Sequence, residues 1–176
     1  MLFVLIVGLL TLAGCAVPLD EKVISSHIAG DVNIEASSIQ YSTNGWFFVT
    51  AKTGDKGTAR QCVLSATDTA LFVYVRPWLD GTLKQDLCLP YSEMRGIGFF
   101  ETERYAQIQI LGDIDIVVLD INGENRIFID KEATRNLYNF ILKKGVPGFD
   151  AEKMMGPKSN MFIFPIIIPI TPAIIF

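Results

Sequence analysis

The sequence predicts an α+β fold in which a small bent antiparallel β-barrel is capped by one C-terminal helix. Between residues 38 and 130, short β-rich runs recur about every 8 to 12 residues between turn signals, a pattern typical of a small barrel or sandwich. After Asp130 the apolar residues change to the spacing of an amphipathic helix. A chain of 176 residues, half of them hydrophobic, can enclose one such core.

The expected strands differ in how strongly the sequence marks them. They are residues 46–49, 60–66, 71–75, 82–89, 97–100, 105–111, 114–118 and 126–129. Ala106, Ile108 and Ile110 alternate with polar residues, as in a half-buried strand. Asp80-Gly81 and Asn122-Gly123 predict hairpin turns, because these residues tolerate the positive φ that tight hairpins require.

The helix is predicted over residues 131–144. Asp130 can cap it, since its carboxylate can accept backbone N–H bonds from the first turn. Gly145 can adopt the left-handed conformation that ends a helix, and Pro147 prevents its continuation. One apolar stripe should face the barrel, formed by Ala133, Leu137, Phe140 and Ile141.

The beginning of the chain resembles a bacterial lipoprotein signal. The uncharged run of residues 2–12 is shorter than the roughly 20 residues of a membrane span and matches a signal-peptide core. It ends in Leu12-Ala13-Gly14-Cys15, which is similar to the lipobox. The resemblance implies that residues 1–14 are removed as a signal peptide and that Cys15 carries the lipid. The alternatives are a membrane-spanning or core helix, and an apolar start to a soluble domain.

This resemblance also implies where the protein lies. Several acyl chains on one residue anchor a protein firmly to a membrane. Ala16 follows the cysteine where Asp would favour the inner membrane, so the periplasmic face of the outer membrane is expected. Residues 15–37 show no sustained period and are predicted to be a tether. A net charge of −4 does not favour nucleic acid as a partner.

Short motifs in the middle of the chain are similar to the PH-like superfold, in its GRAM and bacterial PH versions. Thr67-Asp68 precedes a strand with Leu71-Phe72, and Leu89-Pro90-Tyr91-Ser92-Glu93-Met94 follows. The resemblance covers about residues 46–145 and implies a bent barrel plugged by its C-terminal helix. It implies binding or scaffolding rather than a particular activity. A basic phosphoinositide cluster is not evident, because the first hairpin offers only Lys52, Lys56 and Arg60.

Cys62 and Cys88 have two interpretations, a disulfide or two separate buried thiols. The oxidising compartment implied by the lipobox would permit the disulfide. The strand pattern opposes it, because Cys62 shares a strand face with Leu64 whereas Cys88 should face the other way. A bridge requires Cα atoms within about 7 Å of each other.

Residues 149–176 are expected to form a polar linker and an apolar, proline-rich tail. The tail from Ser159 to Phe176 carries no charge, and its prolines oppose a spanning helix. Three alternatives remain: the tail packs along the barrel, enters the membrane beside the anchor, or docks on an envelope protein. The residues that would make the docking contacts are Met161, Phe162, Phe164, Ile166, Ile168 and Phe176.

No catalytic residue, metal site or cofactor is predicted from the spacing of chemically active side chains. His27 lies in the predicted tether and should be solvated, and Asp113, Asp115 and Asp120 lack the glycine position of a calcium loop. The sequence therefore favours a non-catalytic, membrane-anchored binding or scaffold module. The alternative is an envelope hydrolase or small-ligand-binding protein with a carboxylate site in the barrel, for example Glu93 with Asp115.

Overall fold

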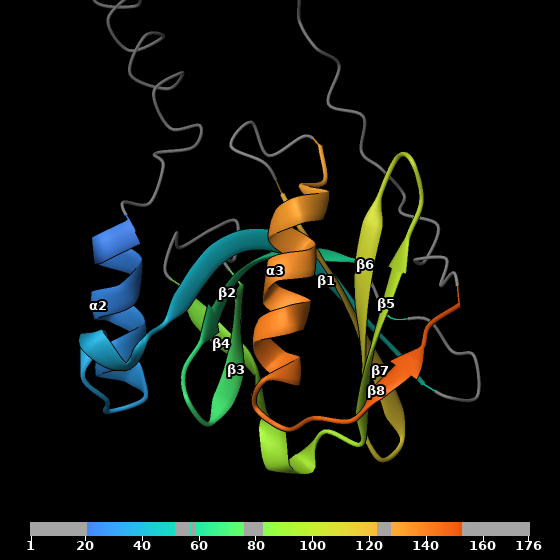
Figure 1. The fold of residues 1–176 in the computed structure, drawn as a ribbon. Coiled ribbons are helices and arrows are strands. Elements are labelled where there is room, and N and C mark those ends of the chain that lie inside the picture. The colour runs from blue at the N-terminus through green and yellow to red at the C-terminus, as the bar shows by residue number, and fades with distance from the viewer. Residues whose placement is uncertain (1–20, 52–56, 58, 76–82, 123–127, 153–176) are drawn as a thin grey trace, which may run out of the picture.

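A computed structural model describes residues 21–51, 57, 59–75, 83–122 and 128–152 (Figure 1). Within these ranges the strands form one eight-stranded sheet in the order β4-β3-β2-β1-β7-β6-β5-β8. The strands are β1 (Tyr41–Ala51), β2 (Arg60–Ala66), β3 (Ala70–Val75), β4 (Lys84–Pro90), β5 (Gly96–Glu101), β6 (Ala106–Leu111), β7 (Asp115–Ile121) and β8 (Gly148–Asp150). The helices are α2 (Glu21–Asp31) and α3 (Lys131–Leu142), with the short 3-10 turns η1 (Ala36–Ser38) and η2 (Tyr91–Glu93).

The long strand β1 joins the two parts of the sheet. Its first residues pair with β2 and its last residues pair with β7. Gly45 lies in the overlap and is paired with a residue of each of these two strands. A Cβ atom on Gly45 would lie 2.2 Å from the backbone oxygen of Asp120, so this position requires glycine. Figure 1 shows β1 curving from the side of α2 towards β7. The predicted α+β class is confirmed, but β4 and β8 remain as edges, so strand pairing does not close the sheet into a barrel.

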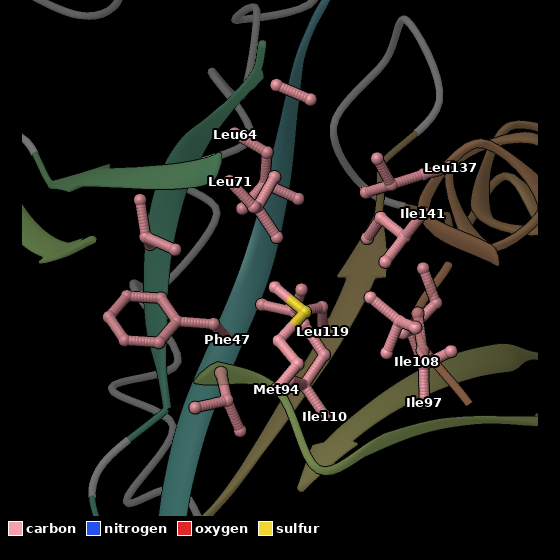
Figure 2. Packing of buried hydrophobic residues seen from close by; sticks show 14 of the residues in the cluster. Phe47, Leu64, Leu71, Met94, Ile97, Ile108, Ile110, Leu119, Leu137 and Ile141 are labelled. Atoms are coloured by element: carbon pink, nitrogen blue, oxygen red, sulfur yellow. The ribbon is translucent and has the colours of Figure 1, made fainter. Parts of the chain in front are cut away.

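The main core lies between the inner face of the sheet and α3. Figure 2 shows side chains from β1, β2, β3, β5, β6 and β7 converging with those of the helix. Leu137 and Ile141 of α3 are fully buried there, as the apolar stripe predicted, while Phe140 is partly buried. Met94, just after η2, also enters this core. The sheet is therefore held in its bend by the helix that packs against it.

The predicted helix is confirmed with its start signal and ends slightly earlier, at Leu142. Asp130 caps it by accepting a bond from the Ala133 amide at 2.9 Å. Thr134 ties the helix to β7, because its hydroxyl accepts a 3.2 Å bond from the Ile121 amide. Gly145 has φ +87°, the left-handed conformation expected after the helix. No helix in the described ranges is long and apolar enough to cross a membrane.

The tether predicted over residues 15–37 is wrong for Glu21–Asp31, which form α2. Ile24 and Ile28 lie one turn apart and pack on the outer side of β2 and β3, against Phe72 and Tyr74. Because this single pair is the helix's main apolar contact, the sequence showed no sustained period. His27 is exposed as predicted, yet its Nε2 donates a 3.1 Å bond to the Leu83 carbonyl and so helps to dock α2.

Two expectations near the end of the domain need correction. Gly148–Asp150, mostly assigned to the linker, form β8, which runs parallel to β5. The strand expected over residues 126–129 is not found in its described part, where Ile129 makes only an isolated bridge with Asn122. The other predicted strands are present with shifted ends, and 60–66 coincides with β2. The β8 error concerns a pairing with a partner far away in the sequence, since Gly148 pairs with Ile97.

Candidate functional site

A cavity of about 530 Å³ opens beside the edge strand β4, between that strand and the β6–β7 hairpin. Its volume is in the range that holds a small molecule or a few side chains of a partner. It is lined by Val49, Leu87, Cys88, Leu89, Pro90, Ser92, Glu93, Met94, Arg95, Ile110, Leu111, Gly112, Asp113, Ile114, Asp115 and Val117. The cavity therefore collects residues from both parts of the sheet at the place where strand pairing does not join them.

The floor of the cavity is apolar. Met94, Ile110 and Val117 are buried members of the main core, and Leu87 and Leu89 of β4 pack against them while remaining partly exposed. The turn η2 is held in place below β4, because the Tyr91 hydroxyl donates a 3.1 Å bond to the Thr67 carbonyl. A ligand in this cavity would thus contact a fixed apolar surface.

The rim of the cavity is charged and mostly acidic. Arg95 pairs with Asp113, and Glu93 and Asp115 add two further carboxylates. Ile114 at the tip of the β6–β7 hairpin is 75% exposed and adds an apolar side chain to this rim. This arrangement can bury an apolar group and attract a cationic one beside it.

The structure separates the carboxylates that the sequence grouped together. Glu93, Asp113 and Asp115 line the cavity, whereas Asp120 does not. Asp120 sits on the outer face of β7, opposite Trp46. Burial raises the pKa of Asp120 to about 7, although a backbone hydrogen bond from Trp46 acts in the opposite direction. Within the described part of the chain, its Oδ1 atom is buried without a hydrogen-bond partner.

In the structure Cys62 and Cys88 are free thiols; Cys62 is buried, whereas Cys88 is exposed and so does not match the expected buried thiol. They lie on strands separated by β3, where Cys62 pairs with Val75 and Cys88 with Phe72. Burial raises the pKa of both thiols, with a smaller contribution from the Asp120 charge at Cys62 and from the Glu93 charge at Cys88. A raised pKa disfavours the thiolate, the form of cysteine that acts as a nucleophile.

Several predicted site residues lie outside the described residues. These are Cys15 and the tail residues Met161, Phe162, Phe164, Ile166, Ile168 and Phe176. In the ranges that are described, no group of three or more His, Cys, Asp or Glu side chains could hold a metal ion.

The sequence motifs included some of the residues that line the cavity, but they gave no indication that a cavity exists. The segment Leu89–Met94, which carried the PH-like resemblance, forms one wall. Arg95 and the apolar floor were missed, because their meeting depends on how β1 bends the sheet. The sequence offered one signal, a Pro-Tyr turn with apolar residues on both sides. This pattern predicts a fixed turn, but it does not predict which residues lie opposite the turn.

Comparison with known proteins assigns no family to these features. No family model matches the chain, and no curated protein matches it significantly. Among solved structures it is similar to the hSac2 domain from human phosphoinositide phosphatase Sac2, with 9% identity over 78% of this chain and 92% of that chain, and a TM-score of 0.45. A similarity at this level does not bear on what this chain binds or does.

Proposed function

We propose that this protein is a non-catalytic binding module of the bacterial envelope, anchored by lipid on Cys15, whose cavity beside β4 receives an apolar segment of a partner protein. The cavity is the observation that carries the proposal, since it combines an apolar floor with a charged rim at a sheet edge. The proposed location is the periplasmic face of the outer membrane. The support for the anchor is the sequence Leu12-Ala13-Gly14-Cys15.

The proposal includes a PH-like architecture for the domain. Its support is that β1 is shared by both parts of the sheet and that α3 packs over the core they enclose. Such folds present their loops and edges to ligands, and the fold alone specifies no chemistry.

The helix α2 makes the proposed anchor short. Because α2 begins at Glu21 and packs on the sheet, only the few residues after Cys15 remain as a connection to the membrane. A chain of that length reaches at most roughly 20 Å. The domain would then be held close to the lipid surface, where its cavity meets partners in the same membrane.

The chemistry of the cavity favours a peptide segment as the ligand. Within the described ranges β4 has β3 as its one strand partner, so an extended peptide can add to its other edge. Leu87 and Leu89 would contact apolar side chains of that peptide, and the acidic rim would favour a Lys or Arg beside them. An anionic ligand is disfavoured by the same rim.

The anchor is tested by the intact mass of the protein isolated from its native membrane. The expected species begins at Cys15 and carries acyl chains, and Cys15→Ala should remain uncleaved or leave the membrane fraction. An unmodified chain that begins at Met1 would contradict the anchor.

The cavity is tested by calorimetry with a capped peptide Leu-Val-Leu-Val-Lys and a matched peptide that ends in Glu. We expect tighter binding of the Lys peptide, and weaker binding to Leu89→Ser. Ser26→Ala, on the exposed side of α2, serves as the matched control and should bind like the unmodified protein. Equal affinity of both peptides for all three proteins, or no binding, would contradict the proposed ligand.

A hydrolase is the second candidate, and one observation favours it: Glu93 and Asp115 line the same cavity. General acid–base catalysis by such a pair contributes about 10²- to 10⁴-fold in rate. On this hypothesis Glu93→Gln and Asp115→Asn should each abolish hydrolysis of peptidoglycan fragments or acyl esters, while Asp120→Asn should not. No hydrolysis by the unmodified protein would reject it.

A further inference from the structure

The face of the sheet opposite the main core carries a row of buried side chains. Gly98 of β5 pairs with Gln109 of β6, Gln109 with Val118 of β7, and Val118 with Phe48 of β1. We call these four residues the outer row. Gln109 is 3% exposed, Val118 2% and Phe48 8%. Side chains on a sheet face become this inaccessible only when something lies over them.

The two described helices do not account for this burial. Leu137 and Ile141 place α3 against the main core, and α2 packs against β2 and β3. Val118 and Phe48 belong to neither of these apolar clusters. Because this burial is that of a single chain, the cover of the outer row must come from another part of the same chain.

The chain that leaves β8 already starts to cross this face. Phe149 pairs with Gly98, and a Cβ atom on Gly98 would lie 2.6 Å from the Phe149 ring and 2.8 Å from the Cβ of Ala151. The absent side chain at Gly98 thus makes room for the chain to pass over β5. The next residue, Glu152, accepts a hydrogen bond at its backbone oxygen from the side-chain amide of Gln109 on β6.

The path from Phe149 to Glu152 follows the outer row from β5 to β6, and the next positions along that row are Val118 and Phe48. Reaching β1 from β6 takes about 10 Å, because neighbouring strands are about 4.8 Å apart. The residues that follow include the uncharged segment 159–176, which is rich in Ile and Phe. A short extended stretch is long enough to bring that segment onto the row.

We infer that the apolar tail, residues 161–176, packs on the outer row of its own domain, continuing the crossing that Phe149, Ala151 and Glu152 begin. Apolar tail residues would cover Val118 and Phe48 and the neighbouring Asp120. The membrane, a partner protein or a second copy of the chain are the other occupants that this assignment excludes. The tail is then a built-in layer of the fold, and partners must use the cavity beside β4 instead.

Cysteine pairing in the full-length protein tests this inference. In a background with Cys62→Ala and Cys88→Ser, we would combine Phe48→Cys with Phe162→Cys, Phe164→Cys, Ile166→Cys or Ile168→Cys, one tail position at a time. Mild oxidation should give an intramolecular disulfide for at least one pair. Ser92→Cys, exposed at the cavity, is the matched control and should give none with the same tail positions.

Two further variants keep the test informative. Trp46→Cys replaces Phe48→Cys if the latter does not fold, since Trp46 is on the same strand and face and is 37% exposed. Gly98→Leu should abolish the cross-link by blocking the crossing, whereas Gly30→Ala, with no atom within 4 Å of its Cβ, should preserve it. Cross-links only between two molecules would overturn the inference in favour of a second copy. No cross-link, together with tail protection only on phosphatidylethanolamine–phosphatidylglycerol vesicles, would overturn it in favour of the membrane.

Discussion

Asp120 is an acidic side chain in a buried environment that disfavours its charged form. A carboxyl group that loses water without gaining full hydrogen bonding resists ionisation, and its pKa rises accordingly. The neighbouring residues on β7, Leu119 and Ile121, face the main core, so Asp120 necessarily faces the outer row side. Burial on that face raises its pKa to about 7, and Asp120 does not line the cavity beside β4.

This environment predicts how stability depends on pH. The folded pKa of Asp120 is about 7, above the value near 4 of an unfolded chain. The folded state holds its proton to higher pH, so the free energy of unfolding should fall as pH rises from about 4 to about 7 and level off above that. Asp120→Asn should remove this component, which is on the order of 2 to 4 kcal/mol. Urea unfolding of both proteins at pH 5 and pH 8 measures it, and parallel pH dependence of the two would refute it.

A pair of glycines tests the close approach of β1 and β7. Gly45→Ala should destabilise the protein by a few kcal/mol, because the new Cβ would overlap the Asp120 carbonyl at 2.2 Å. Gly30→Ala in α2 meets no atom within 4 Å and should stabilise it by about 0.5 to 1 kcal/mol. Thermal unfolding of both variants gives the comparison. Similar effects at the two positions would show that the crossing at Gly45 is wrong.

Among the helices and strands, α2 differs most from what the sequence predicted. It turns part of a predicted tether into a layer on the outer side of β2 and β3, held by Ile24 and Ile28. The Tyr74 hydroxyl donates a 2.8 Å bond to Asp31, which fixes the end of the helix to β3. The folded domain therefore begins closer to Cys15 than the sequence indicates.

Docking of α2 is tested at Ile28, which is fully buried. Ile28→Ala should lower the free energy of unfolding by about 2 to 5 kcal/mol, the usual cost of emptying a buried aliphatic site. Ser26→Ala, exposed on the same helix, should change it by less than about 0.5 kcal/mol. Chemical denaturation measures both. If the segment were a free tether, the two variants would be equally stable.

The elements that sequence reasoning found are those with local signals. Asp130, the apolar stripe and Gly145 each act within a turn or two of α3, and β2 is flanked by its own turns. The opposite faces of Cys62 and Cys88 were also derivable from alternation, since Cys62 packs in the main core and Cys88 pairs with Phe72, which packs on the other side of the sheet. By contrast, β8 exists because Gly148 meets Ile97, a pairing that no local pattern encodes. Similarly, Glu93 of η2 and Asp115 of β7 line one cavity only because the folded sheet brings these distant segments to the same place.

At the scale of the whole domain, the cavity beside β4 and the outer row have separate roles. The cavity lies at the Asp115 end of β7 and is open to a ligand, whereas Thr134 bonds α3 to Ile121 at the other end of the same strand. The outer row is assigned to the protein's own tail. The lipid on Cys15 would supply the membrane attachment, so that neither the cavity nor the tail needs to do so.

The most direct test of the central claim is methyl NMR of the full-length protein during titration with the capped Leu-Val-Leu-Val-Lys peptide. Ile114 and Met94 report on the cavity, and Ile24 and Ile28 on the far side of the sheet serve as internal controls. We expect saturable shifts of the Ile114 and Met94 methyl resonances with no change at Ile24 and Ile28. Shifts confined to the α2 methyls, or none at any of the four residues, would contradict the claim that the cavity is the binding site.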